Sequence, residues 1–474
     1  MPGSAPPTGC SSPCSPPLMH DVTNLASRLG DSISGRVITP ADAGYDQART
    51  VFYPFYDRRP GVIVRPSDAV DVSKTVLAAA ETGLELAVRS GGHSVPGHST
   101  TEGGILLDLS TMARLAIDVD GRSAWAETGM TAGQYTVQTA AHGLATGFGD
   151  TGSVGIGGLT LGGGIGYLVR KHGLTIDNLL AAEMVTADGS QVRVDDTNHP
   201  DFFWAIRGGG GNFGVATRFH FRLHEVGNIV GGMLILPASP EVITRLIVEA
   251  DSAPEELSVI ANIMKAPPMP GLLPDELVGK PVIMLLAYAG PLETGEKIVA
   301  RFRALASPIV DMTGPMPYPE LYRFTEEVPE IKHETTRPLF ADDVDLEGAE
   351  AIVDHLHRTT APLAVAQLRV LGGAMARVPN DATAFAHRHR RIMVATGVVY
   401  DNADEGDLHR EWVHQLTKTL TRGEPDAYVN FLGNEDDRIR DAYPGATWER
   451  LTAIKTKYDP NNLFRLNQNI TTQT

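Results

Sequence analysis

The segment Arg89-Ser90-Gly91-Gly92-His93-Ser94 places in a single turn residue types that bind anions and a histidine that can bond to a ligand. Adjacent glycines let backbone N–H groups converge on an anion without interference from side chains. A lone histidine is more often structural than functional. His93, however, lies beside a predicted anion cradle, and this setting favours a direct role at a bound ligand.

A second glycine-rich segment, residues 147–166, contains ten glycines in 20 positions. Ordinary helices and strands do not tolerate so much glycine, because each glycine loses conformational entropy when it is ordered. A third run, Gly208 to Gly211, follows further along the chain. Together the three segments predict a large cradle for a pyrophosphate and a ring system, with the ligand ordering the loops.

Other chemistry is less well supported by these residues. The pattern G-x-G-x-x-G occurs twice without a strand before it and a helix after it, so a Rossmann site is not expected; the matches are Gly147/Gly149/Gly152 and Gly209/Gly211/Gly214. His98 has no partner at metal-ligand spacing, so no metal site is predicted. Ser94 and Ser153 lack the G-x-S-x-G elbow of a hydrolase. The basic run at 387–391 is interpreted as a solvated helix face rather than an anion site.

Composition sets the broad class of the protein. A chain of 474 residues exceeds one ordinary core, so two domains are expected. The formal net charge of −17 argues against nucleic acid and anionic membranes as partners, and the longest apolar stretch, 281–289, is too short to span a bilayer. Cys10 and Cys14 are the two cysteines, both in a Ser/Pro-rich start that we interpret as a disordered leader. A cytoplasmic enzyme with no disulfide in its folded body is therefore predicted.

A β-α-β unit is predicted to position the first glycine turn. Residues 61–64 and 84–88 are its strands, and Ser67 and Gly83 begin and end its helix. The apolar helix positions are Val70, Val76, Leu77 and Ala80. Further predicted elements are a strand at 104–109, a helix at 131–143 capped by Thr131, a strand from 176, a strand with one wet face at 218–223 and a helix from 448.

Four motifs, in order along the chain, resemble those of the berberine-bridge-enzyme-like flavin oxidases, in the vanillyl-alcohol-oxidase and p-cresol-methylhydroxylase superfamily. They lie at 89–94, 155–166, 207–214 and 458–470, and the likeness extends from about Ile38 to the end. The resemblance implies an α+β, two-domain, vanillyl-alcohol-oxidase-type FAD-binding fold with an inserted α+β substrate domain built on an antiparallel sheet. The expected division is a leader at 1–20, the first part of the FAD-binding domain at 21–225, the substrate-binding domain at 226–433 and a returning C-terminal segment at 434–474.

The resemblance also implies FAD as cofactor, with His93 bonded covalently to the flavin's 8α-methyl carbon. Many members have a second link from a cysteine, but Thr151 occupies that position here, so no cysteinyl link is expected. Val154 matches a position that controls oxygen access, and its small branched side chain is typical of an oxidase. The expected cofactor-binding residues are Arg89, Ser90, Gly91, Gly92, His93, Ser94, Gly97, His98, Thr151, Val154, Gly155, Gly157, Gly158, Leu159, Gly163, Gly164, Gly166, Tyr167, Asn212, Gly214, Val215, Asn467 and Gln468.

The chemistry that the resemblance implies is hydride transfer from a substrate C–H bond to the flavin, with oxygen reduced to hydrogen peroxide. Tyr428 and Asn430 alternate on a predicted strand, and Tyr428 is the leading candidate for the base, although core packing explains it nearly as well. Trp448 replaces a tyrosine found in relatives and is expected to form an aromatic platform. Gln367 and Arg369 are expected to face the substrate.

Two alternatives to an oxidase stay open at this stage. One is a dehydrogenase that uses an acceptor other than oxygen, and the other is a flavin-binding module without turnover. The expected partners are a small organic substrate (an alcohol, sugar, amine or secondary metabolite) and oxygen. A monomer and a homodimer fit the sequence equally well.

Overall fold

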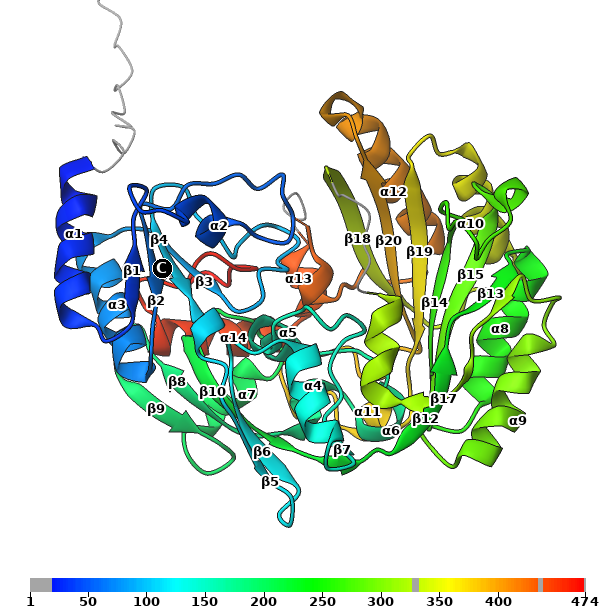
Figure 1. The fold of residues 1–474 in the computed structure, drawn as a ribbon, viewed down its shortest axis with the longest axis horizontal. Helices are drawn as coiled ribbons and strands as arrows, with labels where there is room; N and C mark the ends of the chain where they lie inside the picture. Colours follow the sequence, from blue (N-terminus) through cyan, green and yellow to red (C-terminus); the bar gives the residue numbers. More distant parts are fainter. Residues whose placement is uncertain (1–18, 326–331, 434–437, 473–474) are drawn as a thin grey trace, which may run out of the picture.

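The computed structural model describes residues 19–325, 332–433 and 438–472 (Figure 1). The predicted leader at 1–20, with both cysteines, lies outside the described residues as far as residue 18, whereas residues 19 and 20 already belong to helix α1, Met19–Ser32. No helix within the described ranges is long and apolar enough to cross a bilayer. The chain forms three main β-sheets with helices packed against them.

The first sheet positions the first glycine turn at the end of its edge strand β3. Its strand order is β1-β2-β4-β3, with β1 antiparallel to β2 and the other pairs parallel. The predicted β-α-β unit is present, because α3 connects β2 to β3. The elements are β1 Arg36–Ile38, α2 Tyr45–Arg49, β2 Val62–Arg65, α3 Ala69–Thr82, β3 Leu86–Arg89, β4 Ile105–Asp108 and the short 3-10 helix Leu109–Thr111.

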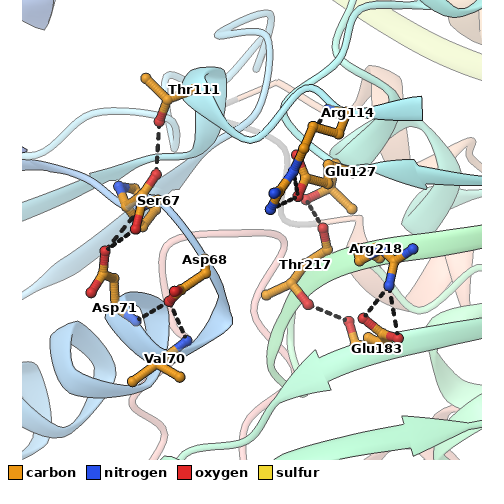
Figure 2. A network of polar contacts seen from close by, with 12 residues as sticks. Ser67, Asp68, Val70, Asp71, Thr111, Arg114, Glu127, Glu183, Thr217 and Arg218 are labelled. Atoms are coloured by element: carbon orange, nitrogen blue, oxygen red, sulfur yellow. Dashed lines mark hydrogen bonds and ion pairs between the residues drawn. The ribbon is translucent and has the colours of Figure 1, made fainter. Parts of the chain in front are cut away.

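Two details of helix α3 differ from the prediction. Asp68, not Ser67, caps the helix: its carboxylate accepts the N–H groups of Val70 and Asp71, while the Ser67 hydroxyl donates to the Asp71 carboxylate (Figure 2). Of the predicted apolar positions, Val76 is buried, whereas Val70 and Leu77 are 48% and 46% exposed and Ala80 is exposed too; Val72 and Ala79 complete the buried stripe. Gly83 ends the helix in a left-handed conformation, as predicted.

The second sheet is antiparallel and has the order β5-β6-β10-β8-β9. Strand β10 alternates buried Phe219 and Phe221 with half-buried Arg218 and His220, which confirms the predicted strand with one wet face. Arg218 pairs with Glu183 of the neighbouring strand β8 (Figure 2). The strands are β5 Leu115–Asp118, β6 Ser123–Glu127, β8 Leu179–Val185, β9 Gln191–Val194 and β10 Val215–Arg222, and β7 Leu144–Ala145 pairs with β11 His224–Glu225.

Short helices connect the second sheet to the glycine segments. Thr131 caps α4 with a capping box completed by Gln134, as the prediction of a Thr131 cap requires. The first G-x-G-x-x-G match does have a strand, β7, before it and a helix, α5, after it, contrary to the prediction. Because β7 pairs antiparallel with β11, this segment still differs from a parallel β-α-β unit. The helices are α4 Ala132–Ala140, α5 Ile156–Gly162, α6 Val169–His172, 3-10 helix Thr175–Asn178 and α7 Pro200–Ile206.

The third sheet has nine antiparallel strands in the order β16-β13-β15-β14-β19-β20-β18, with β12 pairing β15 and β17. Helices α8, α9, α10 and α12 cover one face and build the largest apolar core with it (Figure 1). The strands are β12 Asn228–Gly232, β13 Leu234–Pro237, β14 Leu257–Lys265, β15 Pro281–Tyr288, β16 Val310–Asp311, β17 Gly314–Pro317, β18 His333–Ala341, β19 Leu363–Val370 and β20 Ile392–Tyr400. The helices are α8 Pro240–Ser252, α9 Leu292–Arg303, α10 Leu346–Arg358, α11 Ala374–Arg377 and α12 Gly406–Leu420, with 3-10 helices Asp275–Leu277, Tyr318–Phe324 and Ala403–Glu405.

The basic run at 387–391 is not a solvated helix face. It is a loop that enters β20, and the Arg388 side chain is 2% exposed and paired with Asp177 at 2.7 Å. Arg390 pairs with the buried Asp426 at 2.6 Å. Distant carboxylates make this burial possible, because a buried arginine needs a charged partner.

The last segment returns to the first two sheets. Its elements are 3-10 helix Val429–Phe431, α13 Ile439–Ala442 and α14 Ala446–Tyr458. Lys455 and Asp459, both with fully buried side chains, form an ion pair at 2.6 Å, and the Lys455 ammonium also donates to the carbonyl oxygen of Asn212 at 2.8 Å. Leu463 and Phe464 pack in the core of the first sheet.

Candidate active site

The first two glycine segments are in direct contact. A Cβ atom at Gly91 would lie 2.2 Å from the backbone nitrogen of Gly155, and one at Gly155 would lie 2.2 Å from the nitrogen of Gly91. The Ser90 hydroxyl joins the same contact, since it donates to the carbonyl of Thr128 at 2.5 Å and accepts the N–H of Gly157 at 3.2 Å. Only glycine permits this approach, so the two segments form one backbone-lined cradle.

His93 lies beside this cradle as a neutral imidazole. Burial lowers its pKa to about 4, partly offset by a hydrogen bond from the ring to the backbone of Ser153. Its ring stacks on Phe52 with centroids 4.0 Å apart and an interplanar angle of 24°. A neutral imidazole that donates through one nitrogen keeps a lone pair on the other. That lone pair is what a bond to a carbon atom would require.

Other predicted residues of the first turn have structural partners. Arg89 is paired with buried Asp108 at 2.8 Å and donates to the carbonyl of Thr50 at 3.1 Å, so its guanidinium holds the turn to the preceding segment. The Ser94 hydroxyl accepts the N–H of His98 at 3.0 Å. Burial, with a smaller contribution from Arg58, lowers the pKa of His98 to about 4.

The third glycine run and the candidate base Tyr428 both contact the C-terminal end of helix α5. The N–H groups of Gly208 and Gly210 donate to the carbonyl of Leu161 at 2.9 and 3.0 Å. A Cβ atom at Gly162 would lie 1.9 Å from Oδ1 of Asn430, and the N–H of Gly164 donates to the hydroxyl of Tyr428 at 2.9 Å. The glycines therefore let both predicted side chains pack against the end of this helix.

Tyr428 and Asn430 are brought together, but not on a strand. Tyr428 precedes the 3-10 helix Val429–Phe431, and the Asn430 amide donates to the Tyr428 hydroxyl at 2.9 Å and to the carbonyl of Leu159 at 3.1 Å. The prediction of a strand was wrong because three residues are too few to establish the period of a strand. Burial raises the pKa of Tyr428, and the bonds from Gly164 and Asn430 oppose that rise. The two donors favour the phenolate form of Tyr428, which is the form that can accept a proton.

Gln367 and Arg369 form a polar chain on β19. The Arg369 guanidinium binds Oε1 of Gln367 at 2.9 Å, the carbonyl of Ile165 at 2.7 Å and the carboxylate of Asp150 at 2.8 Å. The Gln367 amide donates in turn to Oδ1 of Asn262 at 2.8 Å. Asp150 and Asn262 were not predicted, and Asp150 could have been noticed as the one acidic residue within the second glycine segment.

A second carboxylate, that of Glu334, lies on the face of the third sheet that also carries Gln367 and Arg369. Residues 334 and 340 of β18 share a face because side chains alternate along a strand, and Phe340 packs in one cluster with Tyr428. Tyr53, whose ring lies against Phe52 at 5.0 Å, donates a hydrogen bond to Glu334. Burial raises the pKa of Glu334 to about 7. No local sequence signal connects residues 53 and 334.

Asn212 and Gln468 make hydrogen bonds that hold the C-terminal tail in place. Asn212 binds the carbonyl of Gln468 at 3.0 Å and the N–H of Ile470 at 2.8 Å, so its amide anchors the tail. The Gln468 amide donates to the carbonyl of Leu432 at 2.9 Å. Trp448 lies in the first turn of α14 with the Arg440 guanidinium 4.7 Å above its ring, and its catalytic role stays a prediction.

Some buried polar atoms have no hydrogen-bond partner in the described part of the chain. Among them are the hydroxyls of Ser99, Thr100 and Tyr167 and the amide oxygens of Asn467 and Asn469. Buried polar atoms are normally satisfied, so these atoms are open to a polar partner. The contacts of Gly97, Thr151, Val154, Gly158, Leu159, Gly163, Gly166, Gly214 and Val215 with a cofactor stay predictions.

Known proteins match both the sequence and the fold. A FAD-binding domain model matches residues 60–195, and a berberine and berberine-like model matches residues 427–471. (R)-6-hydroxynicotine oxidase of Paenarthrobacter nicotinovorans is 31% identical over 94% of this chain and 98% of its own length. Berberine bridge enzyme-like 27 of Arabidopsis thaliana is 29% identical over 94% of this chain and 91% of its own length.

Solved structures agree with this relationship. The crystal structure of 6-hydroxy-D-nicotine oxidase from Arthrobacter nicotinovorans has a TM-score of 0.80 and 28% identity, over 93% of this chain and 98% of its own. Glucooligosaccharide oxidase of Acremonium strictum, at 23% identity, shares the fold with a TM-score of 0.82, over 95% of this chain and 100% of its own. The chain therefore belongs to the berberine-bridge-enzyme-like FAD-linked oxidoreductases, with the predicted α+β fold of the vanillyl-alcohol-oxidase type.

The residues of this chain fit FAD. The contact between Gly91 and Gly155 leaves backbone N–H groups free of side chains, which suits a pyrophosphate. The buried hydroxyl of Tyr167, one residue beyond the second glycine segment, has no hydrogen-bond partner among the described residues and is open to a polar group of a ligand. The neutral His93 stands at the side of the cradle. The protein is thus a FAD-dependent oxidoreductase by family and by the chemistry of its site.

Proposed function

We propose that this protein is an oxidase that removes a hydride from a C–H bond of a small organic substrate, with oxygen reduced to hydrogen peroxide. The observation that carries the proposal is the hydroxyl of Tyr428, which receives hydrogen bonds from Gly164 and Asn430 at the end of α5. Bound FAD supplies the two-electron acceptor. Tyr428 acts as a base in its phenolate form: the phenolate oxygen takes the proton that the substrate hydroxyl or amine loses and becomes the neutral phenol, and Asn430 fixes its position.

We further propose that His93 tethers the flavin and that the tether is single. The neutral imidazole and its stacking on Phe52 support the bond, and Thr151 leaves no thiol for a second one. His93→Ala is expected to release the yellow colour into the supernatant after acid precipitation, whereas the parent retains it in the pellet. Colour that stays with the His93→Ala pellet would contradict the assignment.

The proposed division of the chain is 21–225 and 434–474 for the FAD-binding domain and 226–433 for the substrate-binding domain. The apolar core of the third sheet, whose buried members all lie between Val230 and Leu420, supports it, as does the packing of Phe464 beside the first sheet. Limited proteolysis tests the boundaries, because cuts should collect near residues 226 and 433 if they are correct.

The experiment for the activity is anaerobic bleaching of the flavin, followed by readmission of oxygen. The names of relatives suggest the panel: 6-hydroxynicotine, gluco-, chito- and xylo-oligosaccharides, monolignols and reticuline. Bleaching and then rapid recolouring with peroxide release is the expected result. Bleaching with slow recolouring would indicate a dehydrogenase, and no bleaching by any compound would favour a binding module. Tyr428→Phe should bleach at least about 100-fold more slowly, because it lacks the proton acceptor.

A further inference from the structure

Arg369 lies on the face of strand β19 that is directed toward the second glycine segment. Along β19, Ala366, Leu368 and Val370 pack in the core under helices α8, α10 and α12. Gln367 and Arg369 therefore project from the opposite face. The contact of Arg369 with the carbonyl of Ile165 places its guanidinium at the end of the second glycine segment, close to Tyr428.

The charge of Arg369 is fully matched. Asp150 pairs with it at 2.8 Å, and the side chains are only 4% and 16% exposed for Arg369 and Asp150 respectively. The backbone of Asp150 is itself held, since the Thr325 hydroxyl donates to its carbonyl at 2.6 Å. A pair buried to this degree interacts strongly, because little water screens the two charges.

The neighbourhood of the pair matters for any ligand bound next to Tyr428. The Arg369 guanidinium lies 5.3 Å from the ring of Phe431, and the Phe431 ring lies 5.3 Å from that of Tyr428. An unpaired guanidinium at this place would attract a carboxylate. The paired one offers no net charge to a substrate.

Building on the proposed function, we propose that Asp150 is a positioning and specificity-determining residue: it fixes and neutralises Arg369, so that the site accepts uncharged or cationic substrates and rejects carboxylates. Asp150 acts through Arg369 and not by touching the substrate. Asp150 directly precedes Thr151 in the second glycine segment. The segment that lines the cradle therefore also neutralises the charge of Arg369 on strand β19.

The test uses the flavin-loaded protein and two inert probes, benzoate and benzamide, which are similar in shape and have no oxidisable C–H bond. Dissociation constants come from calorimetry and from perturbation of the flavin spectrum. The parent should bind benzamide better than benzoate. Asp150→Asn should tighten benzoate binding about tenfold or more and change benzamide binding less than about twofold. Arg369→Gln, which leaves Asp150 unpaired, should weaken benzoate binding further, and the double variant should restore the parental ratio.

The reduction potential of the flavin provides a second readout that needs no probe. It should rise in Asp150→Asn and fall in Arg369→Gln, because a net positive charge stabilises the reduced, more negative flavin. Asp177→Asn is the matched control, since it removes the partner of another buried arginine, Arg388, and should move neither the benzoate ratio nor the potential.

Two results would overturn the inference. One is a benzoate-to-benzamide ratio and a potential that stay unchanged in both single variants, and the other is a parent that prefers benzoate. Neither readout requires turnover. A failure of the substrate panel to bleach the flavin would therefore refute the proposed oxidase while leaving the role of Asp150 to be decided by binding and potential.

Discussion

Glu334 should make the protein less stable as the pH rises from about 4.5 to about 7. Its pKa is raised from the ordinary 4.5 to about 7, chiefly by burial. Between these two values the unfolded chain has lost the proton and the folded chain has kept it, so folding stability falls with increasing pH. Below about pH 4.5 both states are protonated, and the stabilising effect is complete. Above about pH 7 both states are ionised, and the effect is lost.

The size of this effect follows from the shift. At about 1.4 kcal/mol per pKa unit, the shift corresponds to about 3 kcal/mol of unfolding free energy as an upper bound. Glu334→Gln removes the ionisation and keeps the shape. It should therefore be more stable than the parent by up to about 3 kcal/mol at pH 8 and nearly equal to it at pH 4.5. With an unfolding entropy of about 2 cal/mol/K per residue, the melting temperature at pH 8 should rise by about 3 °C.

The assay is thermal unfolding of the flavin-loaded protein at pH 4.5, 6, 7 and 8. Glu424→Gln, which changes an exposed glutamate, serves as control and should follow the parent. Tyr53→Phe removes the hydrogen bond that opposes the rise in the Glu334 pKa, so it should destabilise the protein most at pH 8. A Glu334→Gln variant whose advantage over the parent is the same at pH 4.5 and pH 8 would refute the reasoning.

Three further predictions concern the cradle and its anchor. Gly91→Ala should bind little FAD, because its methyl group would clash with Gly155. Gly30→Ala is the control, because the position has open space around it, and it should bind FAD normally. The flavin absorbance per protein measures both. Asp459→Ala should lower the free energy of unfolding, measured by urea titration, by about 3–5 kcal/mol, because it leaves Lys455 buried without its charge partner. Lys457→Met, which removes an exposed ion pair, should lower it by less than about 1 kcal/mol. Thr151→Cys should create a second flavin link, as in the glucooligosaccharide oxidase with 6-S-cysteinyl and 8α-N1-histidyl FAD. The His93→Ala/Thr151→Cys protein should then keep its colour in acid, and loss of that colour would count against the position of Thr151.

Sequence patterns predicted the parts of the site that depend on backbone shape. The glycines at 91 and 155 are visible as unusual local composition, and the structure joins them because only glycine fits there. The pairing of Tyr428 with Asn430 was also predictable from their spacing, although the local conformation was not. Periodicity over three residues does not distinguish a strand from a single helical turn.

Charges brought together from distant positions escaped the sequence patterns. Arg388 was expected at a solvated surface, but its partner Asp177 lies 211 positions away and allows its burial. The pairs Asp150–Arg369 and Tyr53–Glu334 likewise join the glycine-rich half of the chain to the nine-stranded sheet. Ser67 and Asp68 are both residue types that cap helices, so the sequence does not distinguish them. In the structure Asp68 is the cap, and the Asp71 carboxylate in the same turn accepts the N–H groups of the distant residues Ser34 and Gly35.

The anchoring of the tail by Lys455, Asp459 and Asn212 has a consequence for biosynthesis. A ribosome releases residues 60–220 long before it makes the segment that Asn212 grips through Gln468 and Ile470. The contacts of Asn212 with the tail therefore cannot form until the residues of the third sheet have also been made. A chain that stops before residue 468 lacks both contacts of Asn212, so we expect it to carry less flavin per protein than the parent.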